Sequence, residues 1–470
     1  MTIVFNIIIV VTVFNFIIFV HELGHFWAAR WRGMKVDRFQ IWFGKPIWKK
    51  TINGVQYGLG SIPFGGFVSL PQMAPMESIE GKALEDGEEP EKLTPVTPLD
   101  KIIVAFAGPL FSFLLAVACA FGVKALGVKE APSDQAVIGY VEPGSPAEEA
   151  GVRIDDEVIA VSGTPVTAFS GSIDSFEGLI ALSSGEKIEL LVKRPGVAEP
   201  LTIQSGYEIP EAEYAYQRKG LRTIGVWPKQ KIYIGYIMPN SPAAKAGLQP
   251  RDQIVAINDV RLESFRIMQE ITSNAEGAKK YSYLRDGQEY SVMIEPQYPD
   301  EPADYGHKLI GMTFTSFLEE DIVLDYPAVS QQLKDSGSIM WKSLKAVADT
   351  NNDIGLGQMQ GGIGMGHSMY NILASGAGWE RLLWFLVIIN INLAILNLLP
   401  FPILDGGHIV MALYEWISGK MLPTKFLEML QTACFLLIMG FFLYVTSKDV
   451  TEFLPSKQKP AVFYPAEQSQ

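Results

Sequence analysis

The sequence predicts a membrane protein of mixed helix and strand content, with four transmembrane helices, a small membrane-associated β-hairpin or sheet, and two tandem α+β domains. Three observations lead to this prediction. Four long runs lack every charged side chain, one glycine-rich segment alternates with β-branched and aromatic residues, and one pattern occurs twice in the chain. The composition agrees, because the mean hydropathy is +0.17 and only 19% of the 470 residues are charged.

The four apolar runs contain no Asp, Glu, Lys or Arg, and they cover residues 1–20, 102–123, 382–404 and 429–447. Each is about as long as the roughly 20 apolar residues that a helix needs to cross a bilayer. No cation precedes the first run and no small-residue cleavage site closes it before His21, so we expect it to stay as an anchor.

The loop between the first two runs sets the orientation. Residues 30–50 hold seven lysines and arginines against one acid, Asp37. The positive-inside bias therefore places this loop in the cytoplasm, residues 124–381 and the tail from Lys448 outside, and residues 405–428 inside.

These runs divide the chain into segments. We expect a first transmembrane helix (1–30), a β-hairpin region with a loop (31–100), a second transmembrane helix (101–127), two repeated domains (130–228 and 229–316), an amphipathic linker (317–378), a third transmembrane helix (379–410), a cytoplasmic loop (411–427), a fourth transmembrane helix (428–447) and a tail (448–470).

Charge and cysteine content exclude some classes of function. The net charge is −13, from 38 basic and 51 acidic residues, whereas a protein that binds nucleic acid needs a basic face. The two cysteines, Cys119 and Cys434, both lie in apolar runs, so we expect neither a disulfide framework nor a cysteine metal motif.

Residues 55–70 alternate glycine with β-branched and aromatic residues, a pattern typical of a β-hairpin. Because this segment is apolar and cytoplasmic, it is expected to tuck into the membrane against protein. Residues 77–92 are acidic and polar and are expected to form a loop. Residues 319–360 look amphipathic and partly helical, and a glycine-rich stretch over 361–378 leads into the third run.

The outer segment contains an internal repeat at an offset of 96 residues, without gaps. Residues 138–141 (Ile-Gly-Tyr-Val) and 234–237 (Ile-Gly-Tyr-Ile) open the two copies, and Ser-Pro-Ala and Ala-Gly follow in both. The order of strand, turn, short helix and strand resembles the circularly permuted bacterial PDZ domain, which implies recognition of an extended peptide at a sheet edge. The alternative is that the two copies only form a steric cap.

Residues 21–25 read His-Glu-Leu-Gly-His, an HExxH motif that follows the first apolar run directly. On a helix, His21 and His25 lie on one face with the spacing that binds one zinc ion. Glu22 between them can act as general base toward a water molecule at the metal. The motif alone is moderately specific, but ionisable side chains are costly within a membrane and therefore indicate function.

The depth of this motif follows from Arg30, the first cation after the first run. The two histidines precede it by five and nine residues, which places a metal about 8–14 Å inside that point at about 1.5 Å per residue. The site is expected inside the membrane, nearer the cytoplasm. The alternative is structural: two histidines hydrogen-bonded to neighbouring helices beside a buried glutamic acid.

A catalytic zinc needs three protein ligands and one open position. We expect Asp405 to be the third ligand, because it is the first ionisable residue after the third run. Pro400 and Pro402 are expected to break the helix before it, and the two glycines after it are expected to let the backbone turn toward the histidines. His408 is the competing candidate for the third ligand.

Asn392 and Asn397 lie in the uncharged third run, where a primary amide needs a partner. Asn397 is a candidate to bind the substrate backbone or an oxyanion, and a hydrogen bond between helices is the alternative. His307 lies in the second repeated domain and His367 lies in the glycine-rich stretch, and both are expected to face solvent.

These motifs together resemble the site-2 protease family, in its bacterial regulator-of-sigma-E protease type, over nearly the whole chain. The resemblance rests on HELGH in a first span, NxxPxPxLDGGH over residues 397–408, and two PDZ-like modules between spans two and three. It implies a four-helix metalloprotease core with one Zn²⁺, in the bacterial inner membrane. It also implies periplasmic PDZ-like modules, an active site toward the cytoplasmic side, and single-pass membrane substrates, namely an anti-sigma factor or remnant signal peptides.

The resemblance also implies roles for single residues. His21, His25 and Asp405 would bind zinc, and Glu22 would act as acid and base. Four further positions match those that the family associates with substrate handling: Asn392, Asn397, Pro400 and Pro402.

Further features of the family pattern bear on substrate and packing. Residues 55–70 resemble its membrane-associated sheet, which takes up substrate as an extra strand. This sequence departs from the family at Ser112, where the second-span motif has asparagine, and at residues 362–364, where Gly-Ile-Gly replaces Gly-Pro-Ile. Neither departure changes a proposed ligand, so they bear on packing or substrate fit.

Two other classes of function remain open from the sequence. One is a membrane scaffold whose PDZ-like modules bind peptides while the metal site is structural. The other is a metal transporter, which also buries histidine and aspartate, although four spans with a single HExxH motif fit it poorly.

Overall fold

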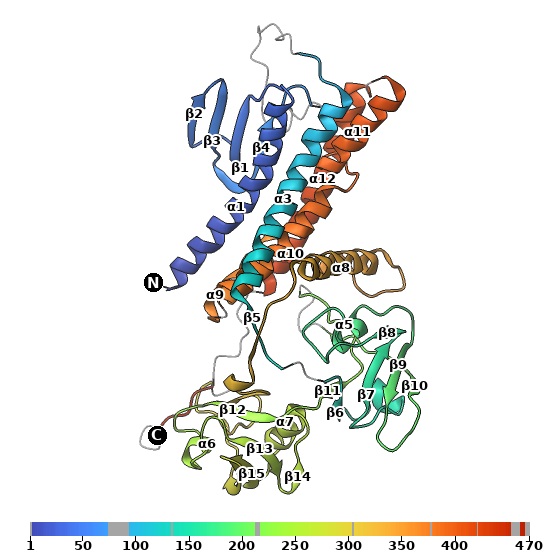
Figure 1. Ribbon diagram of the computed structural model, residues 1–470. Coiled ribbons are helices and arrows are strands. Elements are labelled where there is room, and N and C mark those ends of the chain that lie inside the picture. Colours follow the sequence, from blue (N-terminus) through green and yellow to red (C-terminus); the bar gives the residue numbers. More distant parts are fainter. Residues whose placement is uncertain are drawn as a thin grey trace. The chain divides into compact units, whose positions relative to one another are not determined.

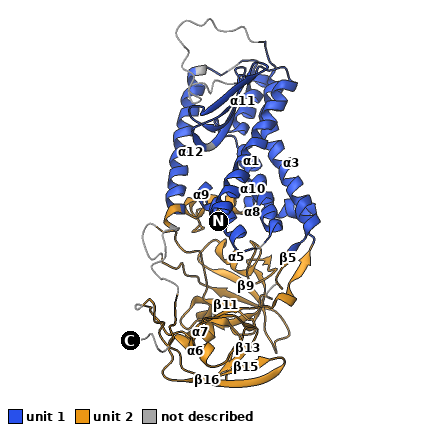
Figure 2. Cartoon of the chain, turned by 90° about the vertical axis from the view of Figure 1, so that its left-hand side faces the viewer, with its two compact units in different colours: residues 1–128, 326–341, 360–449 blue, residues 129–325, 342–359, 450–470 orange. Residues whose placement is uncertain are grey.

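The computed structural model describes residues 2–73, 94–132, 135–211, 217–302, 305–376, 378–420, 422–452 and 461–465. The chain divides into two compact units, coloured separately in Figure 2. The first unit comprises residues 1–128, 326–341 and 360–449, and the second comprises residues 129–325, 342–359 and 450–470. The expected loop over residues 77–92 lies outside the described residues.

Four helices of the described chain are long and apolar enough to cross a membrane. They are α1 (Thr2–Trp31), α3 (Pro98–Leu126), α10 (Trp379–Asn397) and α12 (Thr424–Glu452). Large apolar side chains on them are exposed, among them Phe5 at 60%, Phe121 at 60% and Leu437 at 68%. Exposed apolar side chains along a helix are expected where that helix faces lipid.

Helix α3 lies at the centre of the first unit, where it packs against α1, α10 and α11 (Asp405–Ser418) (Figure 1). It begins at a capping box, in which Thr97 and Asp100 exchange hydrogen bonds between side chain and backbone. Small residues of α3 allow close contact with α10, since Ala116 and Ala120 are fully buried against Val387 and Ile391.

The segment over residues 379–410, expected as one transmembrane helix, forms two helices. Helix α10 ends at Asn397 and α11 begins at Asp405. Pro400 and Pro402 lie between them, where a residue without a backbone N–H is tolerated. Helix α9 (Gly362–Ala374) also belongs to the first unit, and α8 (Val329–Ala348) begins in the first unit and ends in the second. Two short 3-10 helices, η1 (Glu319–Asp321) and η2 (Leu356–Gln358), belong to the second unit.

Four strands form a sheet beside α1: β1 (Arg38–Phe43), β2 (Trp48–Ile52), β3 (Val55–Leu59) and β4 (Ile62–Ser69), in the order β2-β3-β1-β4 (Figure 1). The expectation that residues 55–70 form a hairpin of two directly paired strands is wrong. Strands β3 and β4 both form, but β1 lies between them, parallel to β3 and antiparallel to β4. Strand β4 is therefore an edge of the sheet.

The second unit contains the two repeats. The first repeat has a sheet of order β10-β9-β7-β8, a β11-β6 pair and two short helices. Its elements are β6 (Ile138–Val141), α4 (Pro146–Glu149), β7 (Glu157–Val161), β8 (Thr164–Pro165), α5 (Phe176–Ala181), β9 (Ile188–Lys193), β10 (Leu201–Ser205) and β11 (Val226–Pro228).

The second repeat has one sheet of order β16-β15-β13-β12-β17, with β14 paired to β13. Its elements are β12 (Ile232–Ile237), α6 (Pro242–Lys245), β13 (Gln253–Ile257), β14 (Val260–Arg261), α7 (Phe265–Ser273), β15 (Lys279–Arg285), β16 (Gln288–Ile294) and β17 (Met312–Thr315). Two short strands, β5 (Val128–Glu130) and β18 (Val323–Asp325), pair with each other outside the repeats.

The repeats share local contacts as well as sequence. Ser145 and Ser241, 96 positions apart, each cap a short helix by accepting a backbone hydrogen bond. The buried carboxylates of Asp156 and Asp252, at the same offset, pair with Arg194, which follows β9 directly, and with Arg285, the last residue of β15. In both cases the hydrogen bonds from the arginine to the carboxylate raise the pKa of that arginine.

Candidate metal centre

Helix α1 brings the two histidines of the HExxH motif onto one face. His21 and His25 lie one turn apart, with their Nε2 atoms 3.3 Å from each other. Both side chains are nearly buried, with exposed fractions of 10% and 12%. The helical spacing alone explains this arrangement, since residues four apart on a helix are neighbours.

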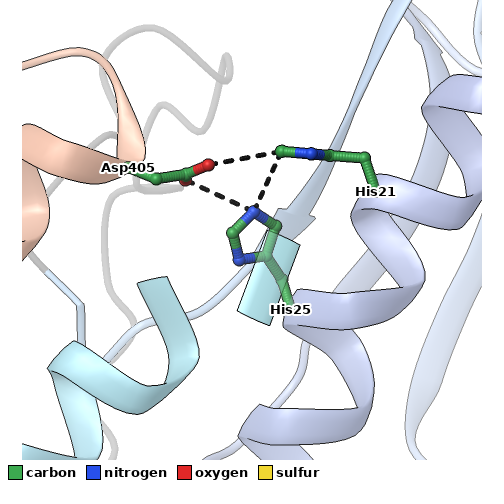
Figure 3. Close-up of side chains that lie close together, drawn as sticks. All are labelled: His21, His25 and Asp405. Atoms are coloured by element: carbon green, nitrogen blue, oxygen red, sulfur yellow. Dashed lines mark hydrogen bonds and ion pairs between the residues drawn. The ribbon is translucent and has the colours of Figure 1, made fainter. Parts of the chain in front are cut away.

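Asp405 completes the cluster from the start of α11 (Figure 3). One carboxylate oxygen lies 3.3 Å from His21 Nε2 and the other lies 3.3 Å from His25 Nε2. Its position in the first turn of a helix favours a negative charge there. Among the described residues, His21, His25 and Asp405 form a group able to hold a metal ion, with ligand atoms within 4.8 Å of one another.

The donor set and its spacing fit zinc. Imidazole nitrogens and a carboxylate oxygen are ordinary zinc ligands, about 2.0–2.2 Å from the ion. Two such ligands of a tetrahedral ion lie about 3.3 Å apart. The three separations in this cluster are each 3.3 Å, so these residues match three corners of a tetrahedron. His408, the competing candidate, is outside the group.

Helix α3 orients both imidazole rings through contacts with their Nδ1 atoms. His21 Nδ1 lies 2.9 Å from the hydroxyl of Ser112, which is fully buried, and His25 Nδ1 lies 2.8 Å from the carbonyl of Val104. A hydrogen bond donated from Nδ1 fixes the tautomer in which Nε2 is free to bind a metal. The partners of the ligands thus come from a third helix, which the sequence analysis did not connect to the site.

Two glycines let α1 and α3 approach closely enough for these contacts. A β-carbon at Gly108 of α3 would lie 2.2 Å from His25 Nε2 and 2.9 Å from His21 Nε2. A β-carbon at Gly24 of α1 would lie 2.4 Å from the carbonyl oxygen of Ala107. A side chain at either position would collide with its neighbour.

Helix α11 is held in place by an ion pair and by close packing. Lys101 Nζ of α3 lies 2.7 Å from a carboxylate oxygen of Glu415, and both side chains are mostly buried. The two glycines after Asp405 do not turn the chain as expected. They lie inside α11, and a β-carbon at Gly406 or Gly407 would lie 2.2 or 2.1 Å from the carbonyl of Leu398 or Phe401. These glycines therefore allow the helix to pack on the preceding turn.

Glu22 lies beside strand β4. A β-carbon at Gly66 of β4 would lie 3.3 Å from Glu22 Cγ and 3.0 Å from Ile18 Cγ2. The edge strand of the small sheet therefore passes directly along the face of α1 that carries the HExxH glutamate.

Of the four residues associated with substrate handling, the structure brings Asn397 to the metal cluster. Its Nδ2 lies 3.5 Å from His21 Nε2. Asn392 lies within α10, and its Oδ1 is buried without a hydrogen-bond partner among the described residues. Pro400 and Pro402 lie in the turn between α10 and α11.

The two remaining histidines lie elsewhere. His307 stacks at an angle on Tyr305 in the second unit, and His367 lies on α9, where its ring stacks on Tyr370. Neither belongs to the metal-binding group found among the described residues.

Comparison with known proteins finds similar sequences over most of the chain. The family model described as peptidase family M50 matches residues 9–441. A Neisseria meningitidis protein whose name includes the words zinc metalloprotease is 30% identical over 421 residues, covering 86% of this chain and 90% of its own. The regulator of sigma E protease of Haemophilus influenzae is 27% identical, covering 88% and 91%. Protease RseP of Yersinia pestis is 26% identical, covering 89% and 92%.

Proposed function

Because this chain belongs to peptidase family M50, the site-2 proteases, we propose that it cuts peptide bonds within the transmembrane segments of single-pass membrane proteins. The family and the names of its relatives make it a zinc metalloprotease, and its four apolar helices make it a membrane protein. The observation that carries the proposal is the cluster of His21, His25 and Asp405. The two histidines lie on α1, which is long and apolar enough to cross a bilayer, and Asp405 lies just after α10, which is long and apolar enough as well.

The three clustered side chains are the proposed zinc ligands. Bound zinc supplies a Lewis acid for the scissile carbonyl and for the attacking water. His21 and His25 present Nε2, because their Nδ1 atoms are occupied by Ser112 and Val104. Asp405 contributes the third donor from a separate helix, so the site requires α1 and α11 to keep their positions relative to each other.

Glu22 is the proposed general base. It follows His21 directly, in the helical turn between the two histidine ligands, and lies next to the edge strand where substrate would arrive. From there its carboxylate would accept a proton from water and later pass it to the leaving amine. Asn397, whose amide lies nearest the cluster, is the first candidate among the four substrate-handling positions to hold the substrate backbone.

Strand β4 is proposed to receive the substrate. A transmembrane helix hides its carbonyls in internal hydrogen bonds, so it must unwind before one of them can react, and unwound backbone in lipid costs several kcal/mol per unpaired group. An edge strand can satisfy those groups by pairing with them. The position of β4, at the sheet edge and next to Glu22, supports this role.

The two repeats are proposed to be PDZ-like domains that select substrates by size. The shared order of strands and helices supports this reading, including the capped helix that begins at Ser-Pro in both copies. If domains of this kind cover the active site, they would exclude a substrate until another protease removes its outer part. The two proposed modes of action are recognition of an extended peptide and a purely steric cap.

The proposed location is the bacterial inner membrane, with the repeats in the periplasm and the zinc toward the cytoplasm. The basic loop of residues 30–50 supports this orientation. The pairing of Val462 in the tail with Glu301 in the second repeat also supports this orientation, because the two proposed crossings between these residues would return the chain to the same side of the membrane. The relatives named for sigma E regulation support an anti-sigma factor as substrate, and remnant signal peptides are the second proposed class.

The test is a cleavage assay on a single-span reporter, combined with metal analysis of the same purified samples. Glu22→Gln should retain zinc and fold but lose at least about 100-fold in rate, as expected for loss of a general base. Glu428→Gln, at an exposed position of α12, serves as the matched control and should cut normally. Undiminished cleavage by Glu22→Gln would overturn the proposed mechanism.

A further inference from the structure

The C-terminal segment of the described chain, residues 461–465, lies on the second repeat. The carbonyl of Val462 accepts hydrogen bonds from the backbone N–H groups of Asp300 and Glu301, at 2.9 and 3.3 Å. The Val462 N–H donates to the Glu301 carbonyl at 2.9 Å, and the Tyr464 N–H donates to the Asp300 carboxylate at 2.7 Å. The segment is therefore held mainly through its backbone, as an added strand is.

One side chain of this segment is buried in the repeat. Phe463 is 6% exposed, and its ring lies so close to Gly311 that a β-carbon there would be 2.9 Å from it. Gly311 has a φ of +76°, which favours glycine in any case. The side-chain amide of Asn240 donates to the Phe463 carbonyl at 3.3 Å. An apolar anchor flanked by backbone hydrogen bonds is a combination that recognises one particular segment.

The first repeat shows that this surface is specific to the second one. At an offset of 96 residues, the positions of Met238, Asn240 and Ala244 are occupied in the first repeat by Glu142, Gly144 and Glu148. There the Glu148 carboxylate accepts a hydrogen bond from the Gly144 backbone at 2.6 Å. The first repeat thus carries two acids and no side-chain amide where the second repeat offers an apolar surface and a donor.

We propose that the second repeat carries a docking surface for an extended apolar segment, and that residues 461–465 of the same chain are its resident partner. Docking ties this repeat to the fourth span, because nine residue steps separate Ala461 from Glu452 at the end of α12. The surface comprises Met238, Asn240, Gly311, Asp300 and Glu301.

A consequence for activity rests on the proposed function. If the repeats select substrates by size, docking of residues 461–465 should matter, because it limits how far the second repeat can move from the end of the fourth span. Release of residues 461–465 would then relax the size limit without changing the metal centre.

The docking itself is tested by hydrogen–deuterium exchange on the full-length protein in nanodiscs. Deletion of residues 461–470 should speed exchange of the Asp300 and Glu301 amides at least about tenfold, because both lose their acceptor. Deletion of residues 466–470 is the matched control and should leave these amides protected. Equal exchange in the two deletions would overturn the proposal.

Two further measurements separate recognition from a loss of folding. Asn240→Gly, which introduces the residue of the first repeat at a position already at φ +61°, should weaken protection without unfolding the repeat. A synthetic peptide of residues 459–467 should restore protection when added to the chain that lacks residues 461–470. Failure to restore it at millimolar peptide would show that the surface does not recognise this segment.

The activity consequence is read with two reporters that differ only in an outer domain. The full-length protein should cut the trimmed reporter alone, and the chain without residues 461–470 should cut both. If the full-length protein cuts neither, the proposed function fails whatever the exchange shows. If exchange changes as expected but selectivity does not, docking stands and its role in size selection is overturned.

Discussion

Gly108 of α3 and His25 of α1 are in contact at the metal centre, and a β-carbon added to Gly108 would lie 2.2 Å from His25 Nε2. This contact makes a helix without any proposed ligand part of the site. It explains why the imidazoles can be held from behind by Ser112 and Val104 while their Nε2 atoms face Asp405.

Gly108→Ala is expected to displace His25 from the cluster. Because the nearest atoms belong to a metal ligand, we expect zinc affinity to fall at least about tenfold, with a parallel loss of proteolysis. Competition with a zinc-selective chelator measures this affinity. Gly440→Ala in α12, where a β-carbon meets nothing within 4 Å, is the control and should bind zinc normally. Equal affinities in the two variants would contradict the packing described here.

Ser112→Ala removes the hydrogen-bond partner of His21 Nδ1 and leaves the ring free to adopt the other tautomer. Loss of such a partner typically costs about 10- to 100-fold in metal affinity or activity. We expect a loss in this range, measured by the same chelator competition. Among the described residues, the Ser447 hydroxyl donates a hydrogen bond to the Tyr444 carbonyl of its own helix, so Ser447→Ala should have no effect. A Ser112→Ala chain with full zinc affinity would show that this hydroxyl does not position His21.

Gly66→Ala tests the contact between strand β4 and Glu22. The new methyl group would lie 3.0 Å from Ile18 Cγ2, 3.1 Å from the Gln40 carbonyl and 3.3 Å from Glu22 Cγ, so β4 or these side chains must give way by a few tenths of an ångström. A misplacement of about 1 Å can cost on the order of 100-fold in rate. We expect kcat/KM for a single-span reporter to fall at least tenfold while zinc content stays unchanged. Gly58→Ala on β3, with its nearest contacts at 3.4 Å, should retain activity.

The ion pair between Lys101 and Glu415 is expected to hold α11, and with it Asp405, against α3. Removing one partner of a mostly buried pair leaves the other uncompensated, which is strongly destabilising. Glu415→Lys should therefore weaken zinc binding, although residue 415 lies ten positions from Asp405. The exchanged double variant, Lys101→Glu with Glu415→Lys, should recover most of the loss. If the double variant binds zinc no better than Glu415→Lys, the pair does not position α11.

The sequence predicts the parts of this site that depend on local spacing and on chemical type. Two histidines four residues apart on a helix share a face wherever that helix lies. Asp405 stands out because an ionisable residue directly after an uncharged run has few other uses in a membrane. The structure brings these same three residues together.

The parts that depend on non-local packing were not predictable. Nothing in residues 55–70 shows that β1, from an earlier segment, inserts between β3 and β4, because a parallel pair requires a crossover that local alternation does not encode. The same limit applies to Ser112, which the sequence marked only as a departure from a family pattern. The sequence predicts that Gly406 and Gly407 let the backbone turn toward the histidines, whereas in the structure their role is set by carbonyl groups of the preceding turn.

The central claim is that α1 and α11 together hold one zinc ion through His21, His25 and Asp405. The most direct measurement is the zinc content, by mass spectrometry, of purified full-length protein and of two variants, Asp405→Ala and His408→Ala. Asp405→Ala is predicted to lose the metal, while His408→Ala keeps close to one zinc per chain. Full zinc in Asp405→Ala, or loss of zinc only in His408→Ala, would contradict the assignment of the third ligand.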